Sequence, residues 1–236
     1  MPIMTDWRIL DGAARRARGL PLGCRTGSNA RLRALLGECV NEIETDGLLA
    51  PVVAYETLAC EVNGADHVLL SGGARLDGVP ALAADLVTAR AVVVAVATIG
   101  AGLEQRVSGL FAAGDPLRAL LLEELGIAAL FELSDRLVPR IESAVCAGKD
   151  RLSHPYQPGE DGLSLAHQRL VCDLAGAGRA GIRLSGAGMM MPVKSVSMIF
   201  GVGAKVPRRT CDDRCAACQA RKRCRYRHGG GRELAA

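Results

Sequence analysis

An almost entirely apolar run from Ala91 to Ile99, followed by Gly100, constrains the fold of this chain more than any other stretch. A helix that crosses a bilayer needs about 20 apolar residues, so this run is too short to span a membrane. Its length and its many valines predict a β-strand buried on both faces. We therefore expect a layered domain built around this strand.

Upstream of this strand, the sequence predicts one helix and one hairpin. Apolar residues recur at helical spacing between Asn29 and Ile43, with Ser28 as the expected N-cap. Asn63-Gly64 separates two extended segments, Leu58 to Val62 and His67 to Leu70, which is a typical signal of an antiparallel hairpin.

Further elements follow in an order that mixes helices and strands. The expected helices are Pro80 to Ala89, a long region from Asp115-Pro116 that Gly126 and Pro139 are expected to divide, and one over Leu165 to Leu174. Extended segments are expected at Gly181 to Ser185 and within the apolar run Met189 to Val202. This order is typical of the α+β and α/β classes, and we expect an α+β domain.

Charge and composition divide the chain into three parts. Residues 1–50 are an N-terminal helical segment, residues 51–203 form the main domain, and residues 204–236 are a cysteine-rich tail. The stretch from Lys205 to Arg227 has a net charge of +7, and because the whole chain carries +4, the remainder carries −3. The basic character therefore belongs to the tail.

The nine cysteines, an odd number, suit a reducing compartment better than a disulfide framework. No export signal is recognised, so the cytoplasm is the expected location. Five cysteines are scattered among apolar neighbours and are expected to pack as small core residues; they are Cys24, Cys39, Cys60, Cys146 and Cys172.

The tail carries the strongest metal signal. Cys211, Cys215, Cys218 and Cys224 have the spacing C-x3-C-x2-C-x5-C, which brings four thiolates close enough to hold a [4Fe-4S] cluster or, alternatively, zinc; unligated thiols are the third interpretation. Flanking arginines would lower the thiol pKa values. The first three cysteines match radical S-adenosylmethionine enzymes in spacing, but their place at the end of the chain argues against that class.

Several other site types are not supported. Gly100-Ala101-Gly102 follows the buried strand, but Gln105 occupies the third glycine position of the dinucleotide fingerprint. No catalytic triad or pair of acids can be assembled, and the four histidines are scattered. Arg221-Lys222-Arg223 and Tyr226 are a weak signal for nucleic acid, but the chain has few other aromatic residues to stack on bases, so no nucleic-acid partner is expected. No membrane partner is expected.

Three segments, at residues 97–104, 151–156 and 189–197, together resemble the activation domain of cobalamin-dependent methionine synthase. Ala97 to Glu104 is similar to that family's Thr-Ile-Gly-x-x-Leu-Glu signature, and Met189 to Ser197 is similar to its Met-Met-x-Pro-x-x-Ser-Val-Ser strand. Arg151-Leu-Ser-His-Pro-Tyr156 resembles the Arg-x-x-Pro-Gly-Tyr loop, although His154-Pro155 stands where Pro-Gly is expected. The resemblance covers about residues 50 to 203 and ends before the tail.

This resemblance implies a curved single domain with a mainly antiparallel sheet flanked by helices, to which the tail would add a small metal-binding lobe. It also implies an S-adenosylmethionine groove. Arg151 would hold the methionyl carboxylate in its guanidinium fork, and Tyr156 would pack against the ligand. The other residues expected to bind this cofactor are Ser153, Gly188, Pro192 and Ser195.

The implied function is reductive methylation of cob(II)alamin, carried by a partner methionine synthase or another corrinoid methyltransferase, within methionine biosynthesis. The chain itself lacks the base-off cobalamin signature, since Asp66 and His67 are adjacent. A flavodoxin- or ferredoxin-like protein would supply the electron. The alternatives are a non-catalytic iron-sulfur or zinc adaptor and a redox carrier that docks a corrinoid protein.

Overall fold

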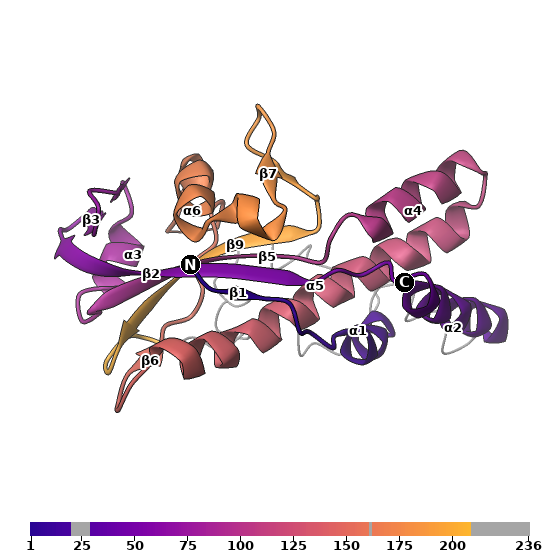
Figure 1. Cartoon of the computed structure of the whole chain (residues 1–236), viewed down its shortest axis with the longest axis horizontal. Helices are drawn as coiled ribbons and strands as arrows, with labels where there is room; N and C mark the ends of the chain where they lie inside the picture. The colour runs from indigo at the N-terminus through magenta and orange to yellow at the C-terminus, as the bar shows by residue number, and fades with distance from the viewer. Residues whose placement is uncertain (20–28, 161, 209–236) are drawn as a thin grey trace, which may run out of the picture.

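β5 (Ala91–Thr98) lies at the centre of the sheet, and all eight of its residues are buried. The computed structural model in Figure 1 describes residues 1–19, 29–160 and 162–208. Along its whole length β5 pairs with β2 on one side and with β9 on the other, both antiparallel. The prediction of a central buried strand is confirmed.

The main sheet has seven strands and is antiparallel throughout. Its order is β4-β3-β2-β5-β9-β6, and β1 also pairs with β2. The strands other than β5 are β1 (Ile3–Met4), β2 (Val52–Asn63), β3 (His67–Leu70), β4 (Arg75–Asp77), β6 (Arg151–Leu152) and β9 (Ser195–Gly203). A separate two-stranded ribbon joins β7 (Arg183–Leu184) to β8 (Met190–Met191).

Helices cover both faces of this sheet (Figure 1). The helical elements are α1 (Leu10–Ala17), α2 (Ala30–Thr45), α3 (Pro80–Asp85), α4 (Gly102–Ala112), α5 (Pro116–Val145) and α6 (Gln168–Ala175), with short 3-10 turns η2 (Leu165–His167) and η3 (Ala177–Ala180). The structure is therefore a mixed domain of a mainly antiparallel sheet with helices, which confirms the α+β prediction.

Side chains of β5 alternate between two hydrophobic clusters because successive strand residues point to opposite faces. Val93 and Ala95 pack with residues of α1, α2, α4 and α5, whereas Val92 and Val94 pack with residues of α3 and α6. The N-terminal fifty residues thus contribute β1 to the sheet and two helices to the cluster around α5. The long helix α5 crosses the sheet beneath these strands (Figure 1).

Some element boundaries differ from the sequence predictions. Asn29, not Ser28, caps α2, because its side-chain oxygen accepts from the backbone amides of Arg31 and Leu32 at 3.0 and 3.2 Å. α5 runs unbroken through Gly126 and Pro139, so the expected division is wrong. None of the helices within the described ranges is long and apolar enough to cross a membrane.

Candidate functional site

The loop from Arg151 to Tyr156 runs beside β9 and begins with the edge strand β6. Arg151 pairs with Gly203 in the sheet, and Tyr156 forms an isolated antiparallel bridge with Ile199. The Arg151 side chain is exposed, whereas Tyr156 is only 4% exposed. Both residues therefore pair with β9, but the Arg151 side chain faces solvent and the Tyr156 side chain is buried.

The side chain of Tyr156 is buried in the cluster that includes residues of α3 and α6. Its hydroxyl donates to the carboxylate of Asp85, the last residue of α3, and its ring centroid lies 4.4 Å from that of His154. His154 Nε2 lies 3.8 Å from Asp85 Oδ2. Tyr156 thus connects the loop to α3, a role that the sequence alone did not predict.

Ser153 is also turned inward and is 3% exposed. Its hydroxyl donates to the carbonyl of His154 and accepts from the amide of Gly201, each at 2.8 Å. Both bonds go to main-chain groups, so the Ser153 side chain holds the loop against β9.

The start of the tail also binds this loop. Arg151 Nε donates to the carbonyl of Val206 at 3.1 Å, and Arg208 Nε donates to the carbonyl of Leu152 at 3.3 Å. Glu142 of α5 accepts from the Leu152 amide at 3.0 Å and pairs with Arg208. The chain therefore passes along the loop just before the cysteine-rich segment begins.

A second group of predicted site residues lies around the turn into β9. Gly188 has a positive φ of 81° in the β7–β8 hairpin, a conformation that favours glycine. Pro192 follows a cis peptide bond, and its carbonyl accepts from the Ser195 hydroxyl at 2.7 Å. These residues shape the corner at which β8 turns into β9.

The structure does not bring the two groups together at one point. Ser195 begins β9 and Gly203 ends it, and a strand rises by about 3.3 Å per residue, so Ser195 and the partner of Arg151 are separated by about 26 Å. Tyr156, beside Ile199, lies between them. Arg151, Ser153 and Tyr156 form one candidate site, and Pro192 and Ser195 belong to another region.

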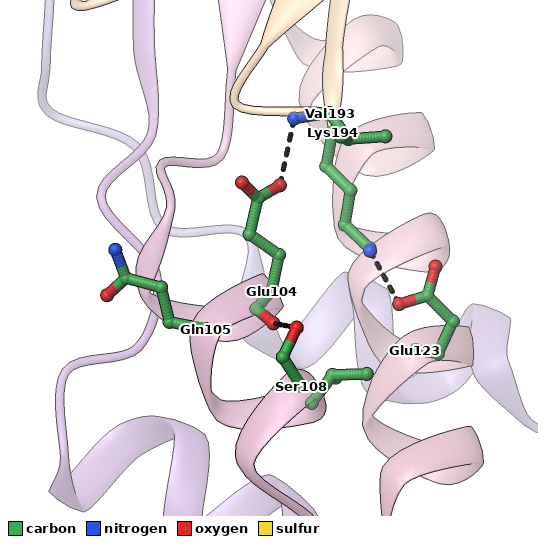
Figure 2. A pocket seen from close by; sticks show the side chains of 7 residues that line it. Glu104, Gln105, Ser108, Glu123, Val193 and Lys194 are labelled. Carbon is green, nitrogen blue, oxygen red and sulfur yellow. Dashed lines mark hydrogen bonds and ion pairs between the residues drawn. The ribbon is translucent and has the colours of Figure 1, made fainter. Parts of the chain in front are cut away.

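A pocket of about 320 Å³ opens beside that second region and is lined by Glu104, Gln105, Val107, Ser108, Glu123, Val193 and Lys194. Figure 2 shows the Lys194 side chain extending along α5 to Glu123 and the Glu104 carboxylate rising toward Val193. Lys194 Nζ lies 2.7 Å from Glu123 Oε2, and Glu104 Oε2 accepts from the Val193 amide at 2.8 Å. We call these residues the charged pocket.

Lys194 reaches Glu123 because α5 carries no side chain at Gly126. A Cβ at Gly126 would lie 2.5 Å from Cε of Lys194 and 2.6 Å from Cδ2 of Leu103. Glycine in a helix interior costs about 1 kcal/mol relative to alanine. The position thus gives up helix stability and leaves room for the lysine stem.

Replacing Gly126 with Ala should lower the free energy of unfolding by about 1 to 3 kcal/mol, because the new methyl group overpacks the contact with Lys194 and Leu103. Gly109→Ala in α4 is the matched control: nothing lies within 4 Å of its Cβ position, so it should gain up to about 1 kcal/mol. Urea denaturation of both variants measures the difference. Equal stabilisation by the two alanines would contradict the packing account.

Two of the cysteines that were expected to pack in the core are buried. Cys39 and Cys172 are buried, as predicted, whereas Cys60 and Cys146 are half-buried. Burial raises the pKa of both the Cys39 and the Cys172 thiol to about 11. Within the described ranges, no three Cys, His, Asp or Glu side chains group as metal ligands. Cys24 and the proposed ligands Cys211, Cys215, Cys218 and Cys224 lie outside those ranges.

Native Cys39 and Cys172 should therefore react slowly with iodoacetamide at pH 8. The thiolate is the nucleophile, and a pKa near 11 keeps both groups protonated until the pH approaches that value. Mass spectrometry of peptides after timed alkylation measures each site, with the urea-unfolded chain as the control. Equal rates in the native and unfolded chains at pH 8 would refute the prediction.

We compared the chain with protein families, curated proteins and solved structures. No family model matches this chain, and no curated protein matches it. Among solved structures, it is similar to the crystal structure of the MetH reactivation domain bound to AdoHcy, with a TM-score of 0.65 and 10% sequence identity. The alignment covers 90% of this chain and 83% of that chain. The chain therefore has the fold of the MetH reactivation domain.

Proposed function

We propose that this chain binds S-adenosylmethionine and supports the reductive methylation of cob(II)alamin carried by a partner corrinoid protein. One solved structure with a similar fold is a reactivation domain bound to AdoHcy, the product that remains when S-adenosylmethionine gives up its methyl group. The identity of 10% leaves the function to be argued from the site itself.

The proposal rests on one observation, the exposed guanidinium of Arg151. Its Nε is anchored on the Val206 carbonyl, and its terminal nitrogens have no partner among the residues that the structure describes. An exposed guanidinium with both terminal nitrogens available can clasp a carboxylate through two parallel hydrogen bonds. We infer that Arg151 binds the methionyl carboxylate, while Ser153 and Tyr156 hold the loop that presents it.

The reaction needs orientation more than acid-base catalysis. One electron reduces cob(II)alamin on the partner to cob(I)alamin, whose cobalt attacks the methyl carbon; the Co–C bond forms as the S–C bond breaks, and S-adenosylhomocysteine leaves. The protein would supply proximity by fixing the sulfonium methyl group opposite the cobalt. A flavodoxin- or ferredoxin-like donor would deliver the electron.

Methyl transfer tests this function directly. The full chain is mixed with a corrinoid methionine synthase that lacks its own activation domain, a reducing system and S-adenosylmethionine labelled in the methyl group. We expect label on cobalamin only when the chain and the reductant are both present. S-adenosylmethionine binding without any transfer would instead indicate an adaptor that does not take part in the chemistry.

We also propose that the four tail cysteines, Cys211, Cys215, Cys218 and Cys224, hold a [4Fe-4S] cluster, with zinc as the alternative. Thiolate ligands at this spacing support either group. Anaerobic purification followed by visible absorption and analysis of iron and zinc distinguishes them. Stoichiometric zinc would overturn an electron-transfer role for the tail.

A further inference from the structure

We propose that the charged pocket is a second ligand site, which takes a small zwitterion of the α-amino acid class. It lies between α4, α5 and the corner that leads into β9, and it shares no lining residue with the Arg151–Tyr156 loop. Its volume of about 320 Å³ falls at the lower end of the range of small-molecule sites. The proposal does not depend on the function proposed above.

The pocket offers one cation with unused hydrogen-bond donors. Lys194 is 6% exposed, and its ammonium has three N–H donors. Within residues 1–19, 29–160 and 162–208, only Glu123 accepts from it. A buried ammonium with two unused donors favours a ligand that brings a carboxylate or another acceptor.

The same pocket offers two carboxylates. One oxygen of Glu104 accepts from the Val193 amide, and one oxygen of Glu123 accepts from Lys194. The second oxygen of each has no partner within the described part of the chain. Two carboxylates against one ammonium leave a net charge of −1, which favours a ligand that also carries a positive group.

These charges fit a zwitterion better than a metal ion or a simple anion. A divalent cation prefers several oxygen ligands and would be repelled by the Lys194 ammonium. A simple anion would be attracted by the Lys194 ammonium but repelled by the carboxylates of Glu104 and Glu123. A ligand with an ammonium and a carboxylate on one carbon can satisfy both signs at once.

Local features indicate that the pocket is preorganised. The helix-interior glycine at position 126 leaves the space through which the Lys194 stem passes, and the Val193 amide fixes the Glu104 carboxylate (Figure 2). A buried lysine and a glycine inside a helix are both unfavourable for stability. Departures of this kind from local rules are typical of functional sites.

Ligand-observed NMR with the proteinogenic L-amino acids, added singly to the full chain, tests the proposal. At least one should bind with a dissociation constant below about 10 mM. The methyl ester and the N-acetyl derivative of the tightest binder each remove one charge and should bind about 10-fold more weakly or worse. Absence of binding by every amino acid would overturn the proposal.

The matched variant is Lys194→Met with Glu123→Gln, which removes both charges and leaves no lone ion buried. It should abolish amino acid binding, whereas Arg90→Met with Asp150→Asn, which removes a pair with a 2.6 Å contact elsewhere, should not. Equal binding by the two double variants would also overturn the proposal. Circular dichroism checks that each variant is folded.

A parallel titration with S-adenosylmethionine separates this site from the loop. If the charged pocket is distinct, the Lys194→Met/Glu123→Gln variant keeps its S-adenosylmethionine affinity while Arg151→Ala loses it. The reverse pattern would support the charged pocket as the place where the amino acid part of S-adenosylmethionine binds, and it would contradict the role of Arg151.

Discussion

Replacing Phe200 with Ala should lower the free energy of unfolding by about 3 to 5 kcal/mol, the range for a fully buried aromatic residue. Phe200 is fully buried in β9, pairs with Val93 of β5 and belongs to the cluster that packs against α5. Removing its ring leaves a cavity at the centre of the domain, where neighbouring strands and helices limit relaxation.

Phe111→Ala is the matched control, because Phe111 in α4 is 49% exposed. Its loss should change the stability by less than about 1 kcal/mol. Urea denaturation followed by circular dichroism measures both variants. Similar losses at the two positions would show that the sheet does not form the core described here.

Arg151→Ala should weaken S-adenosylmethionine binding by about 10- to 100-fold, the equivalent of a charge-assisted hydrogen bond worth about 1.5 to 3 kcal/mol. The side chain is exposed, and its one bond within the described residues runs to the Val206 carbonyl. Loss of affinity with little loss of stability is therefore expected.

Isothermal titration calorimetry compares this variant with Arg75→Ala, which removes an exposed arginine paired with Asp77 at 2.5 Å. The control should bind as tightly as the unmodified chain. Arg151→Lys should recover only part of the affinity, since an ammonium cannot form the paired bonds of a guanidinium. Unchanged affinity in Arg151→Ala would refute its role.

Elements with a strong local pattern were predicted well from the sequence. The valine-rich run became β5, the Asn63-Gly64 signal became the β2–β3 hairpin, and Asp115 caps α5 by accepting from the Arg118 amide. In each case the residues that determine the structure lie close together in the chain. The spacing of apolar residues and the residues typical of turns and helix caps were therefore sufficient to predict these elements.

Predictions failed where distant residues decide the outcome. Pro139 does not end α5, because Leu133, Leu137 and Ile141 on both sides of it are buried in the core, and tertiary packing outweighs the local preference. The inward position of Tyr156 depends on Asp85, which lies 71 positions earlier. No local pattern reveals such a partner.

The charged pocket was missed for the same reason. Lys194 and Glu123 are also 71 positions apart, and neither belongs to a motif that links them. Glu104 and Lys194 lie in two of the segments that the sequence singles out, and Gly126, a glycine inside a strongly helical pattern, is a further signal of close packing or function. The sequence alone predicts a helix break at Gly126, whereas this glycine makes room for a side chain from another part of the chain.

Equilibrium dialysis of the unmodified chain against tritiated S-adenosylmethionine tests the central claim most directly. The account predicts saturable binding at a single site, with a dissociation constant below about 1 mM, and competition by S-adenosylhomocysteine. No retained label at that concentration, with the protein folded by circular dichroism, would show that the chain keeps the fold of a reactivation domain without its ligand.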